Sequence, residues 1–216
     1  QLPLVDTDER VVGLKLLDDL LESRHARPNC VVLMAGGLGQ RLRPLTEEMP
    51  KPMLPVGDKP ILETIIDSFV EQGFSRFYIS VNYIADKVIA HFGDGKKWNA
   101  EIQYLQESEP LGTAGGLGLL PRPRTGPILV MNTDILTRVN FEHLIEFHID
   151  NGVAATMCVR EYDIEVPFGV VDVDSYRING IVEKPSHSFF VNAGIYVFEP
   201  EALDRIPRGA HLDMPA

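Results

Sequence analysis

The chain has 216 residues and a formal net charge of −11 at pH 7, and 44% of its residues are hydrophobic. This size suits one large α/β domain, or one domain with a fragment of a second. The apolar runs are about as long as strands, far below the ~20 residues of a membrane helix, and no secretion signal opens the sequence. Nucleic-acid binders usually carry a basic stripe, which this acidic chain lacks. We therefore expect neither a nucleic-acid nor a membrane partner.

The two cysteines, Cys30 and Cys158, each lie in an apolar run that contains β-branched residues. Buried, reduced thiols are the simplest interpretation of a cysteine in such a run. We therefore expect a cytoplasmic protein.

The first 23 residues predict a strand at 2–5, a polar turn, a second strand at 10–14 and a helix with a leucine-rich face at 16–21. A unit of this size cannot form a core by itself. We therefore expect residues 1–23 to be the C-terminal remnant of a small module. The polar segment 24–29 ends in Pro-Asn and predicts a linker.

From residue 30 to residue 216 strand and helix patterns alternate, which predicts one α/β domain. Strands are expected at 30–34, 77–81, 101–106, 127–131 and 153–159. A helix is expected to begin at Asp58 and end at Gly73, and others cover 85–92, 113–120 and 141–151. The later chain is β-rich, with strands at 169–173, 178–183 and 189–198. This alternation predicts a Rossmann-like, doubly wound mixed sheet, largely parallel, with added antiparallel strands at one side.

Three glycines follow the strand at 30–34, in the sequence Ala35-Gly-Gly-Leu-Gly. Arg41 and Arg43 come directly afterwards, and Lys51 stands between two prolines. Glycines let a ligand approach the backbone N–H groups closely, and the cations supply positive charge. The spacing fits neither the phosphate loop of nucleotide triphosphatases nor the dinucleotide fingerprint. A tight turn alone would not need cations nearby, so we favour a cradle for a polyphosphate.

Asp134 follows the strand at 127–131, in the sequence Met-Asn-Thr-Asp. Open α/β sheets bind ligands at the carboxyl ends of their strands. A carboxylate at that edge suits Mg²⁺, which prefers oxygen ligands and substrate phosphates. A turn or helix cap explains the aspartate equally well, so both interpretations remain open here.

A second glycine-rich segment, Leu111-Gly-Thr-Ala-Gly-Gly, comes shortly after Glu107. Its N–H groups, at the start of a predicted helix, suit a base, a ribose or a phosphate. A closely packed helix start is the alternative, and the residues do not decide between the two.

Two later motifs mark the β-rich part of the chain. Glu183-Lys-Pro ends a strand and, taken alone, predicts an exposed turn. Asn192-Ala-Gly interrupts another strand, where glycine indicates either close approach of a ligand or a bulge. Asn192 could then bind a polyol.

Together these motifs resemble the sugar-nucleotide pyrophosphorylase family, nucleotidyltransferases that make NDP-sugars from sugar 1-phosphates. The resemblance runs from about residue 30 to the end, with the motifs in the family's order. Residues 2–22 resemble, over a shorter stretch, the closing strands and helix of a CBS domain, a module that often binds adenosine ligands. The combination is similar to the CBS-bearing branch of the family, including mannose-1-phosphate guanylyltransferases.

The resemblance implies a role for each motif. The nucleotide would contact Ala35, Gly36, Gly37, Gly39, Glu107, Gly112 and Thr113, with the first three glycines at the triphosphate and Glu107 and Gly112 near the base and ribose. The catalytic residues would be Arg41 at the leaving pyrophosphate, Lys51 at the reacting phosphates and Asp134 at Mg²⁺. The sugar would contact Gly169, Glu183 and Asn192, and its phosphate Lys184.

One departure from the family concerns the metal. The family supplies a second metal carboxylate from a later Trp-x-Asp segment, which these 216 residues do not contain. We therefore expect the nucleotidyltransferase domain, residues 30–216, to be truncated at its C-terminus.

The implied reaction condenses an NTP, with GTP favoured, and a sugar 1-phosphate into an NDP-sugar and pyrophosphate, with Mg²⁺ as cofactor. The sugar phosphate is already an anion at neutral pH, because its second pKa is about 6, so the reaction needs no general base. Catalysis is then positioning and neutralisation of charge. A non-catalytic nucleotide-sensing or scaffold subunit of the same fold is the alternative. The resemblance also allows a homo-oligomer and an adenosine ligand on the CBS-like module.

Overall fold

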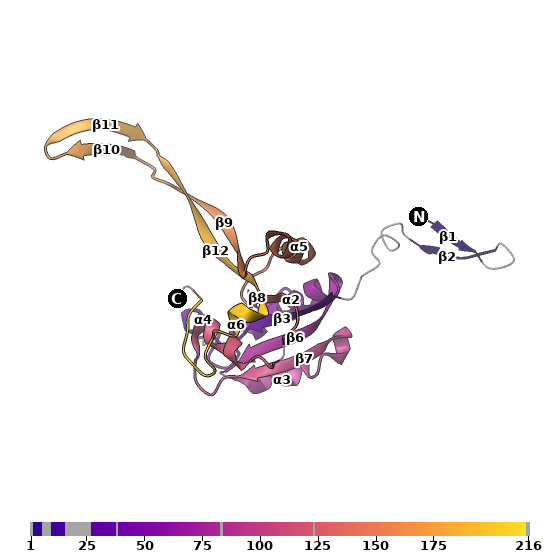
Figure 1. Ribbon diagram of the computed structural model, residues 1–216. Helices are drawn as coiled ribbons and strands as arrows, with labels where there is room; N and C mark the ends of the chain where they lie inside the picture. Colours follow the sequence, from indigo (N-terminus) through magenta and orange to yellow (C-terminus); the bar gives the residue numbers. More distant parts are fainter. Residues whose placement is uncertain are drawn as a thin grey trace.

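The computed structural model describes residues 2–5, 10–15, 27–37, 39–82, 84–122 and 124–214. Its body is a six-stranded sheet in the order β7-β6-β3-β8-β12-β9 (Figure 1). The strands are β3 (Arg27–Met34), β6 (Phe74–Val81), β7 (Glu101–Gln106), β8 (Ile128–Asn132), β9 (Ala155–Glu165) and β12 (Ser186–Phe198). The first four strands in the order run parallel, and β12 is antiparallel to both β8 and β9. The prediction of a Rossmann-like mixed sheet with added antiparallel strands is confirmed.

Helical segments cover both faces of this sheet. The helices α2 (Ile61–Glu71), α3 (Ala85–Phe92) and α5 (Phe141–Asn151) pack on one face, and η4 (Gly116–Leu119) and α6 (Pro200–Leu203) pack on the other. The remaining short elements are η1 (Gln40–Leu42), η2 (Lys51–Met53), β4 (Pro55–Val56), β5 (Lys59–Pro60), η3 (Lys96–Trp98) and α4 (Gly112–Gly115). The doubly wound arrangement therefore has a helical layer on each side.

The core follows from the alternation of side chains along the central strands. In β3, Val31 and Leu33 face the layer of α2, whereas Cys30 and Val32 face the opposite layer. Successive side chains of a strand point to opposite faces, so an uninterrupted apolar run is what a strand buried on both faces requires.

The two cysteines are free thiols. Cys30 is buried in β3 and Cys158 is partly buried in β9. Burial raises the pKa of both thiols above the ordinary value. Both cysteines lie in strands, as the sequence predicts, and the expected burial is complete for Cys30 and partial for Cys158.

Several element boundaries differ from the expectation. The predicted linker was wrong for 27–29, because β3 begins at Arg27, whose N–H donates to the Gly73 carbonyl. The strand at 77–81 begins earlier, at Phe74. The helix expected at 113–120 is divided into α4 and η4. The bounds of α3, β7 and α5 match the prediction.

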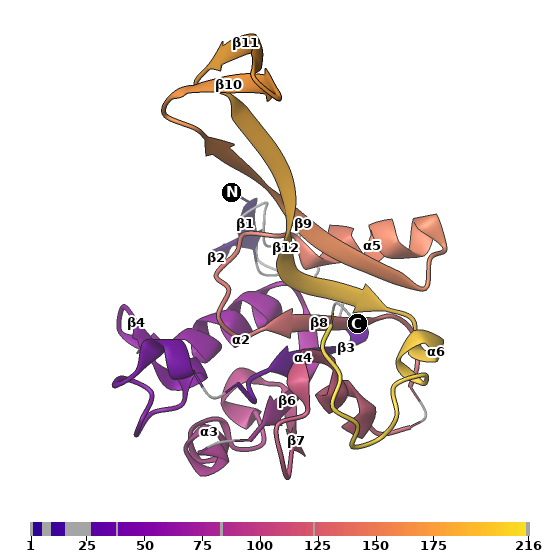
Figure 2. The ribbon, with the colours of Figure 1, turned by 90° about the vertical axis from the view of Figure 1, so that its left-hand side faces the viewer.

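A long hairpin of β9 and β12, here called the arm, extends beyond the sheet and carries β10 (Gly169–Asp174) and β11 (Arg177–Glu183) at its end (Figures 1 and 2). Tyr162 pairs with Phe189, and both side chains are about half exposed. Ile164 shares their face, because side chains alternate along a strand, whereas Glu161 and Asp163 lie on the opposite face. Phe190, which pairs with Glu161, is also strongly exposed on that opposite face, so both faces of the arm carry exposed aromatic side chains.

The N-terminal strands β1 (Leu2–Val5) and β2 (Val11–Lys15) pair antiparallel in a separate two-stranded sheet. This pair agrees with the strands expected near the N-terminus. The predicted turn at 6–9, the helix at 16–21 and the linker residues 24–26 lie outside the described residues. The assignment of residues 1–23 to a CBS-like remnant stays a prediction.

Among the described helices, none combines the length and the apolar character that crossing a bilayer requires.

Candidate active site

The predicted site residues follow two strands at the centre of the sheet. The parallel strands β3 and β8 are neighbours, with Met34 opposite Asn132 at their carboxyl ends. Chain order reverses at this point, because β6 and β7 lie on one side of β3 and β8 lies on the other. Open α/β sheets bind ligands at such a switch point. The hydroxyl of Thr133 donates to the Met34 carbonyl at 3.0 Å and so ties the two strand ends together.

The first glycine loop starts directly after β3, and its three glycines have different surroundings. A methyl group at Gly36 would lie 2.8 Å from a carboxylate oxygen of Glu107. One at Gly37 would meet no atom within 4 Å. Gly39 has a φ of 61° and accepts a hydrogen bond from Thr46 at 2.8 Å through its carbonyl. The loop is therefore fixed at both ends and open to an approaching ligand at Gly37.

Lys51 lies beside this loop and forms an ion pair with Asp134. The Nζ of Lys51 contacts Oδ2 of Asp134, although 83 positions separate the two residues. A methyl group at Gly39 would lie 3.4 Å from Cβ of Lys51, which places the lysine against the loop. Both charged side chains are between one third and one half exposed. The structure thus brings the glycine loop, Lys51 and Asp134 together at one edge of the sheet.

Arg41 lies in η1, two residues after Gly39. Its side chain is exposed, and it forms no hydrogen bond or ion pair with any residue that the structure describes. The guanidinium is therefore free to meet an anion near the loop. Its contact with pyrophosphate stays a prediction.

Asp134 could contribute one carboxylate ligand to a metal ion. Across the described part of the chain, no three His, Cys, Asp or Glu side chains gather as a metal site. Mg²⁺ is commonly held by one or two carboxylates together with substrate phosphates and water. A single part-exposed aspartate close to the open glycine loop suits that ion, and assignment of Mg²⁺ stays a prediction.

The second glycine loop is occupied by another part of the chain. The Leu212 carbonyl accepts from the N–H groups of Ala114 and Gly115, at 2.9 and 3.0 Å. The Asp213 carboxylate accepts from the N–H of Thr113 at 3.0 Å, and this hydrogen bond lowers the pKa of Asp213. A methyl group at Gly112 would lie 2.5 Å from the Leu212 oxygen. These glycines therefore permit close packing within the chain, and contact of Gly112 or Thr113 with a nucleotide stays a prediction.

Glu107 lies between the two glycine loops. Its carboxylate accepts hydrogen bonds from the hydroxyl of Ser80 and from the N–H of Leu111, the latter at 3.0 Å. Both oxygens thus have partners within the chain. The expected contact of Glu107 with a base or ribose remains untested.

Three of the residues expected to bind the sugar lie at the far end of the arm, and Asn192 lies in β12 where the arm meets the body. Gly169 and Glu183 are paired in the β10–β11 hairpin, and Lys184 follows it. The side chain of Asn192 donates to the Tyr196 hydroxyl and accepts from the N–H of Gly194, where the strand pairing shifts. A bulge, one of the two alternatives for this segment, is therefore present. Figures 1 and 2 show the β10–β11 hairpin projecting away from the body, and within the described part of the chain no hydrogen bond or ion pair joins these four residues to Lys51 or Asp134.

Three residues that form contacts in this region were not predicted from the sequence. Ser80 holds Glu107, and its signal was a hydroxyl near the end of an apolar strand. Thr133 joins β3 to β8 and stands directly before Asp134. Asp213 contacts Thr113 across 100 positions, and nothing local in the sequence indicates that contact.

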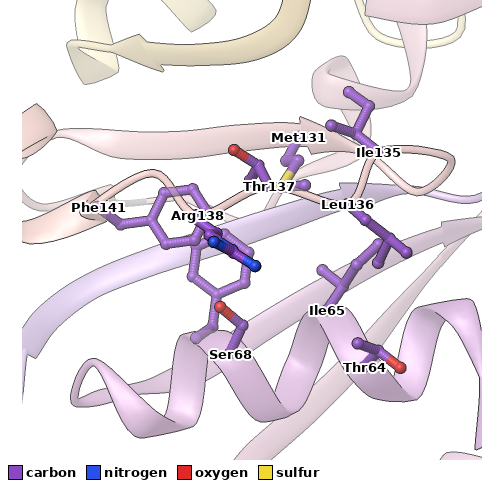
Figure 3. A pocket seen from close by; sticks show the side chains of 10 residues that line it. Thr64, Ile65, Ser68, Met131, Ile135, Leu136, Thr137, Arg138 and Phe141 are labelled. Atoms are coloured by element: carbon purple, nitrogen blue, oxygen red, sulfur yellow. The ribbon is translucent and has the colours of Figure 1, made fainter.

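A cavity of about 310 Å³ lies beside the segment that follows Asp134, apart from the glycine loops (Figure 3). Its walls include Phe69, Met131 and Phe141, with Ser68 and Arg138 also lining it. None of the glycines or cations discussed above contributes to it. This apolar cavity is therefore distinct from the candidate phosphate site.

Solved structures share this fold. HddC from Yersinia pseudotuberculosis matches with a TM-score of 0.67 and 28% identity, over 86% of this chain and 84% of that chain. HddC complexed with GMP-PN matches with a TM-score of 0.65 and 28% identity, over 86% and 82%. The fold is that of the nucleotide-diphospho-sugar transferases.

The chain belongs to the nucleotidyl transferase family, whose model matches residues 30–213. The catalytic subunit beta of mannose-1-phosphate guanylyltransferase from Drosophila melanogaster is 36% identical over 182 residues, covering 81% of this chain and 49% of that protein. The mannose-1-phosphate guanylyltransferase of Mycobacterium tuberculosis is 34% identical over 187 residues, covering 85% and 52%. The chain thus spans about half the length of these curated relatives. The family is confirmed, whereas the CBS-bearing branch stays a prediction.

Proposed function

We propose that the protein transfers the nucleotidyl group of an NTP to a sugar 1-phosphate, forming an NDP-sugar and pyrophosphate. The observation that carries this proposal is the Lys51–Asp134 ion pair beside the open glycine loop. GTP is the favoured nucleotide, because the similar fly and mycobacterial proteins are named guanylyltransferases and HddC was solved with GMP-PN.

The chemistry explains why a lysine, an arginine and bare amides suit this site. An oxygen of the sugar phosphate attacks the α-phosphorus in line, a new P–O bond forms, and the bond from that phosphorus to the bridging oxygen breaks. Pyrophosphate takes the bonding electrons and leaves. The barrier comes from repulsion between two anions and from charge growing on the leaving group. In the proposed complex, Lys51 neutralises the reacting phosphates, Arg41 meets the pyrophosphate, and the backbone at Gly37 approaches the triphosphate.

Mg²⁺ is proposed as the cofactor, with Asp134 as its ligand from this chain. When bound, the ion would neutralise phosphate charge and help to align the NTP. Lys51 and Asp134 neutralise each other in the ion pair, and Lys51 would be available to a phosphate if Asp134 held the ion. The pair therefore keeps both groups at the reacting centre before substrates arrive.

The sugar half of the site is proposed on the arm, at Gly169, Glu183, Lys184 and Asn192. Its support is the resemblance of these motifs to the family. Because the β10–β11 hairpin projects from the body (Figure 2), a nucleotide-sensing or scaffold role without turnover is the second candidate. That role would use the glycine loop and leave the arm without a substrate.

A substrate panel tests the proposal. The protein is incubated with each NTP, Mg²⁺ and a set of sugar 1-phosphates, and released pyrophosphate is measured. We expect release with GTP and at least one sugar phosphate. Calorimetric binding of nucleotide without turnover in any combination would favour the sensing role, and neither binding nor turnover would contradict both.

Two substitutions test the ion pair itself. Lys51→Ala and Asp134→Ala should each reduce pyrophosphate release by about 10² or more, as expected for loss of a preorganised charge at the transition state. Lys96→Ala is the matched control, because Lys96 also pairs with an aspartate, Asp94, at 2.6 Å, but at the start of η3, where both side chains are well exposed. A control variant that lost as much activity as the site variants would contradict the assignment.

A further inference from the structure

Glu107 has an unusual position, because its carboxylate lies against both glycine loops. A methyl group at Gly36 would come within 2.8 Å of its Oε1, and one at Gly116 within 2.9 Å of the same oxygen. The two loops therefore approach each other with the carboxylate between them. Only residues without a side chain leave room for it there.

The carboxylate is held by two donors from different elements. Ser80, at the end of β6, donates its hydroxyl to Oε1, and Leu111, before α4, donates its N–H to Oε2. The Ser80 carbonyl also accepts from the N–H of Ala35 at 2.9 Å, so the same residue anchors the start of the first glycine loop. Hydrogen bonds to a charged oxygen are stronger than neutral ones. Glu107 is therefore hydrogen-bonded to the second loop and to β6, and it reaches the first loop through Ser80 and by close contact with Gly36.

The second loop is fixed from its other side by residues 210–214, here called the strap. Leu212 donates its N–H to the Leu111 carbonyl at 2.9 Å and accepts from Ala114 and Gly115. Asp213 accepts from Thr113. The second loop, which donates to Glu107 through Leu111, is therefore also hydrogen-bonded to the strap, and this holds the donor to the carboxylate in place.

We propose that Glu107 is a positioning residue that braces the first glycine loop, keeping its amides arranged for the phosphates of an NTP. The proposal rests on the proposed function, because it assumes that this loop binds a polyphosphate. A loop that is already ordered loses less conformational freedom on binding, and affinity rises accordingly. The brace acts on phosphate binding whatever base the nucleotide carries.

A ligand without a base separates this role from recognition of the base. Wild-type protein, Glu107→Gln and Ser80→Ala are titrated by calorimetry with inorganic tripolyphosphate and with the four NTPs, in the presence of Mg²⁺. Glutamine keeps the size of glutamate and can still accept from Leu111, while its NH2 group donates to the Ser80 hydroxyl, so the substitution removes the negative charge from both hydrogen bonds. We expect Glu107→Gln to weaken binding of tripolyphosphate and of every NTP by a similar factor of about ten or more, because charged hydrogen bonds become weaker neutral ones.

Glu109→Gln is the control, since Glu109 is exposed, carries the same charge and lies on the same segment. Its affinities should equal those of the wild type. A loss confined to one NTP, with tripolyphosphate unchanged, would show that Glu107 reads the base and would overturn the proposal. Unchanged affinities for all ligands would overturn it as well.

A second measurement needs no ligand and so separates failure of the brace from failure of the proposed function. Gly36→Ala is introduced into the wild type and into Glu107→Ala, and unfolding in urea is followed for all four proteins. Since the added methyl group would collide with the fixed carboxylate, it should lower the unfolding midpoint in the wild type and lower it much less in Glu107→Ala. Equal effects in both backgrounds would refute the brace, whereas a wild type that binds no polyphosphate but shows the coupling would refute only the proposed function.

Discussion

At the level of single residues, the three glycines of the first loop serve different purposes. Gly36 makes room for Glu107, and Gly39 adopts a left-handed conformation against Thr46. Gly37 has neither constraint, since its missing side chain would point into open space. Its role is therefore to expose the backbone to whatever approaches the loop.

This difference predicts opposite results for two similar substitutions. Gly37→Ala should lower the affinity for NTP, because the methyl group stands where phosphate approaches, and leave the unfolding midpoint of the free protein unchanged. Gly39→Ala should destabilise the protein by about 1–2 kcal/mol, because alanine at a φ of 61° is strained. Calorimetry with GTP and thermal unfolding of both variants check the prediction. A Gly37→Ala protein that binds GTP normally would contradict the proposed approach of phosphate at this position.

At the level of elements, the sheet body and the arm differ in how far they bury apolar side chains. Phe69 of α2 is fully buried and stacks on Phe141 of α5, with 4.0 Å between ring centroids. Phe189 of β12 is half exposed and pairs with Tyr162 across the arm. The core of the domain therefore lies in the body, and the arm adds little to it.

The contrast predicts different costs for removing the two rings. Phe69→Ala should lower the free energy of unfolding by about 3–5 kcal/mol, the usual cost of a cavity left by a buried aromatic ring. Phe189→Ala should change it by less than about 1 kcal/mol, because the ring already meets water on one side. Denaturant unfolding of both variants measures the two changes in the free energy of unfolding. Comparable decreases would mean that Phe189 is buried in solution and would contradict the exposed arm.

At the level of the whole molecule, charge is distributed unevenly. The net charge is −11, yet the candidate site collects Lys51 and Arg41 around the glycine loop. An acidic protein that handles anionic substrates needs such a local group of cations, because the overall field repels those substrates.

The strap joins two distant parts of the chain and gives the fold a dependence on pH. A hydrogen bond from Thr113 lowers the pKa of Asp213 below its ordinary value of 3.8. Because the pKa of Asp213 is lower in the folded protein, the ionised carboxylate stabilises the fold. This stabilisation is fully present above pH 3.8 and is lost as the pH falls through the folded-state pKa of Asp213. The difference in unfolding midpoint between wild type and Asp213→Asn should therefore be constant near neutrality and shrink below about pH 4. A difference that stayed constant in acid would contradict the assigned contact.

Local patterns in the sequence predicted most of the body. Apolar spacing identified α2, α3 and α5, and the run at 30–34 identified a buried strand, because periodicity and turn chemistry act over a few residues. The start of β3 was misplaced, because Arg27 and its neighbours are polar and join the ladder only through backbone pairing with β6. The glycine loop, Lys51 and Asp134 were predicted as one site, and the structure brings them together.

The sequence by itself thus determined the class of fold, and its motifs, through the resemblance they carry, named the glycine loop, Lys51 and Asp134 as candidates for one site. Only the tertiary structure decided that the second glycine loop holds the strap, that Glu107 has both oxygens engaged, and that three of the four proposed sugar residues lie at the far end of a projecting arm. The physical reason is the separation of the partners along the chain: Leu212 and Asp213 meet a loop about 100 positions away, and no local pattern of residues encodes such a contact.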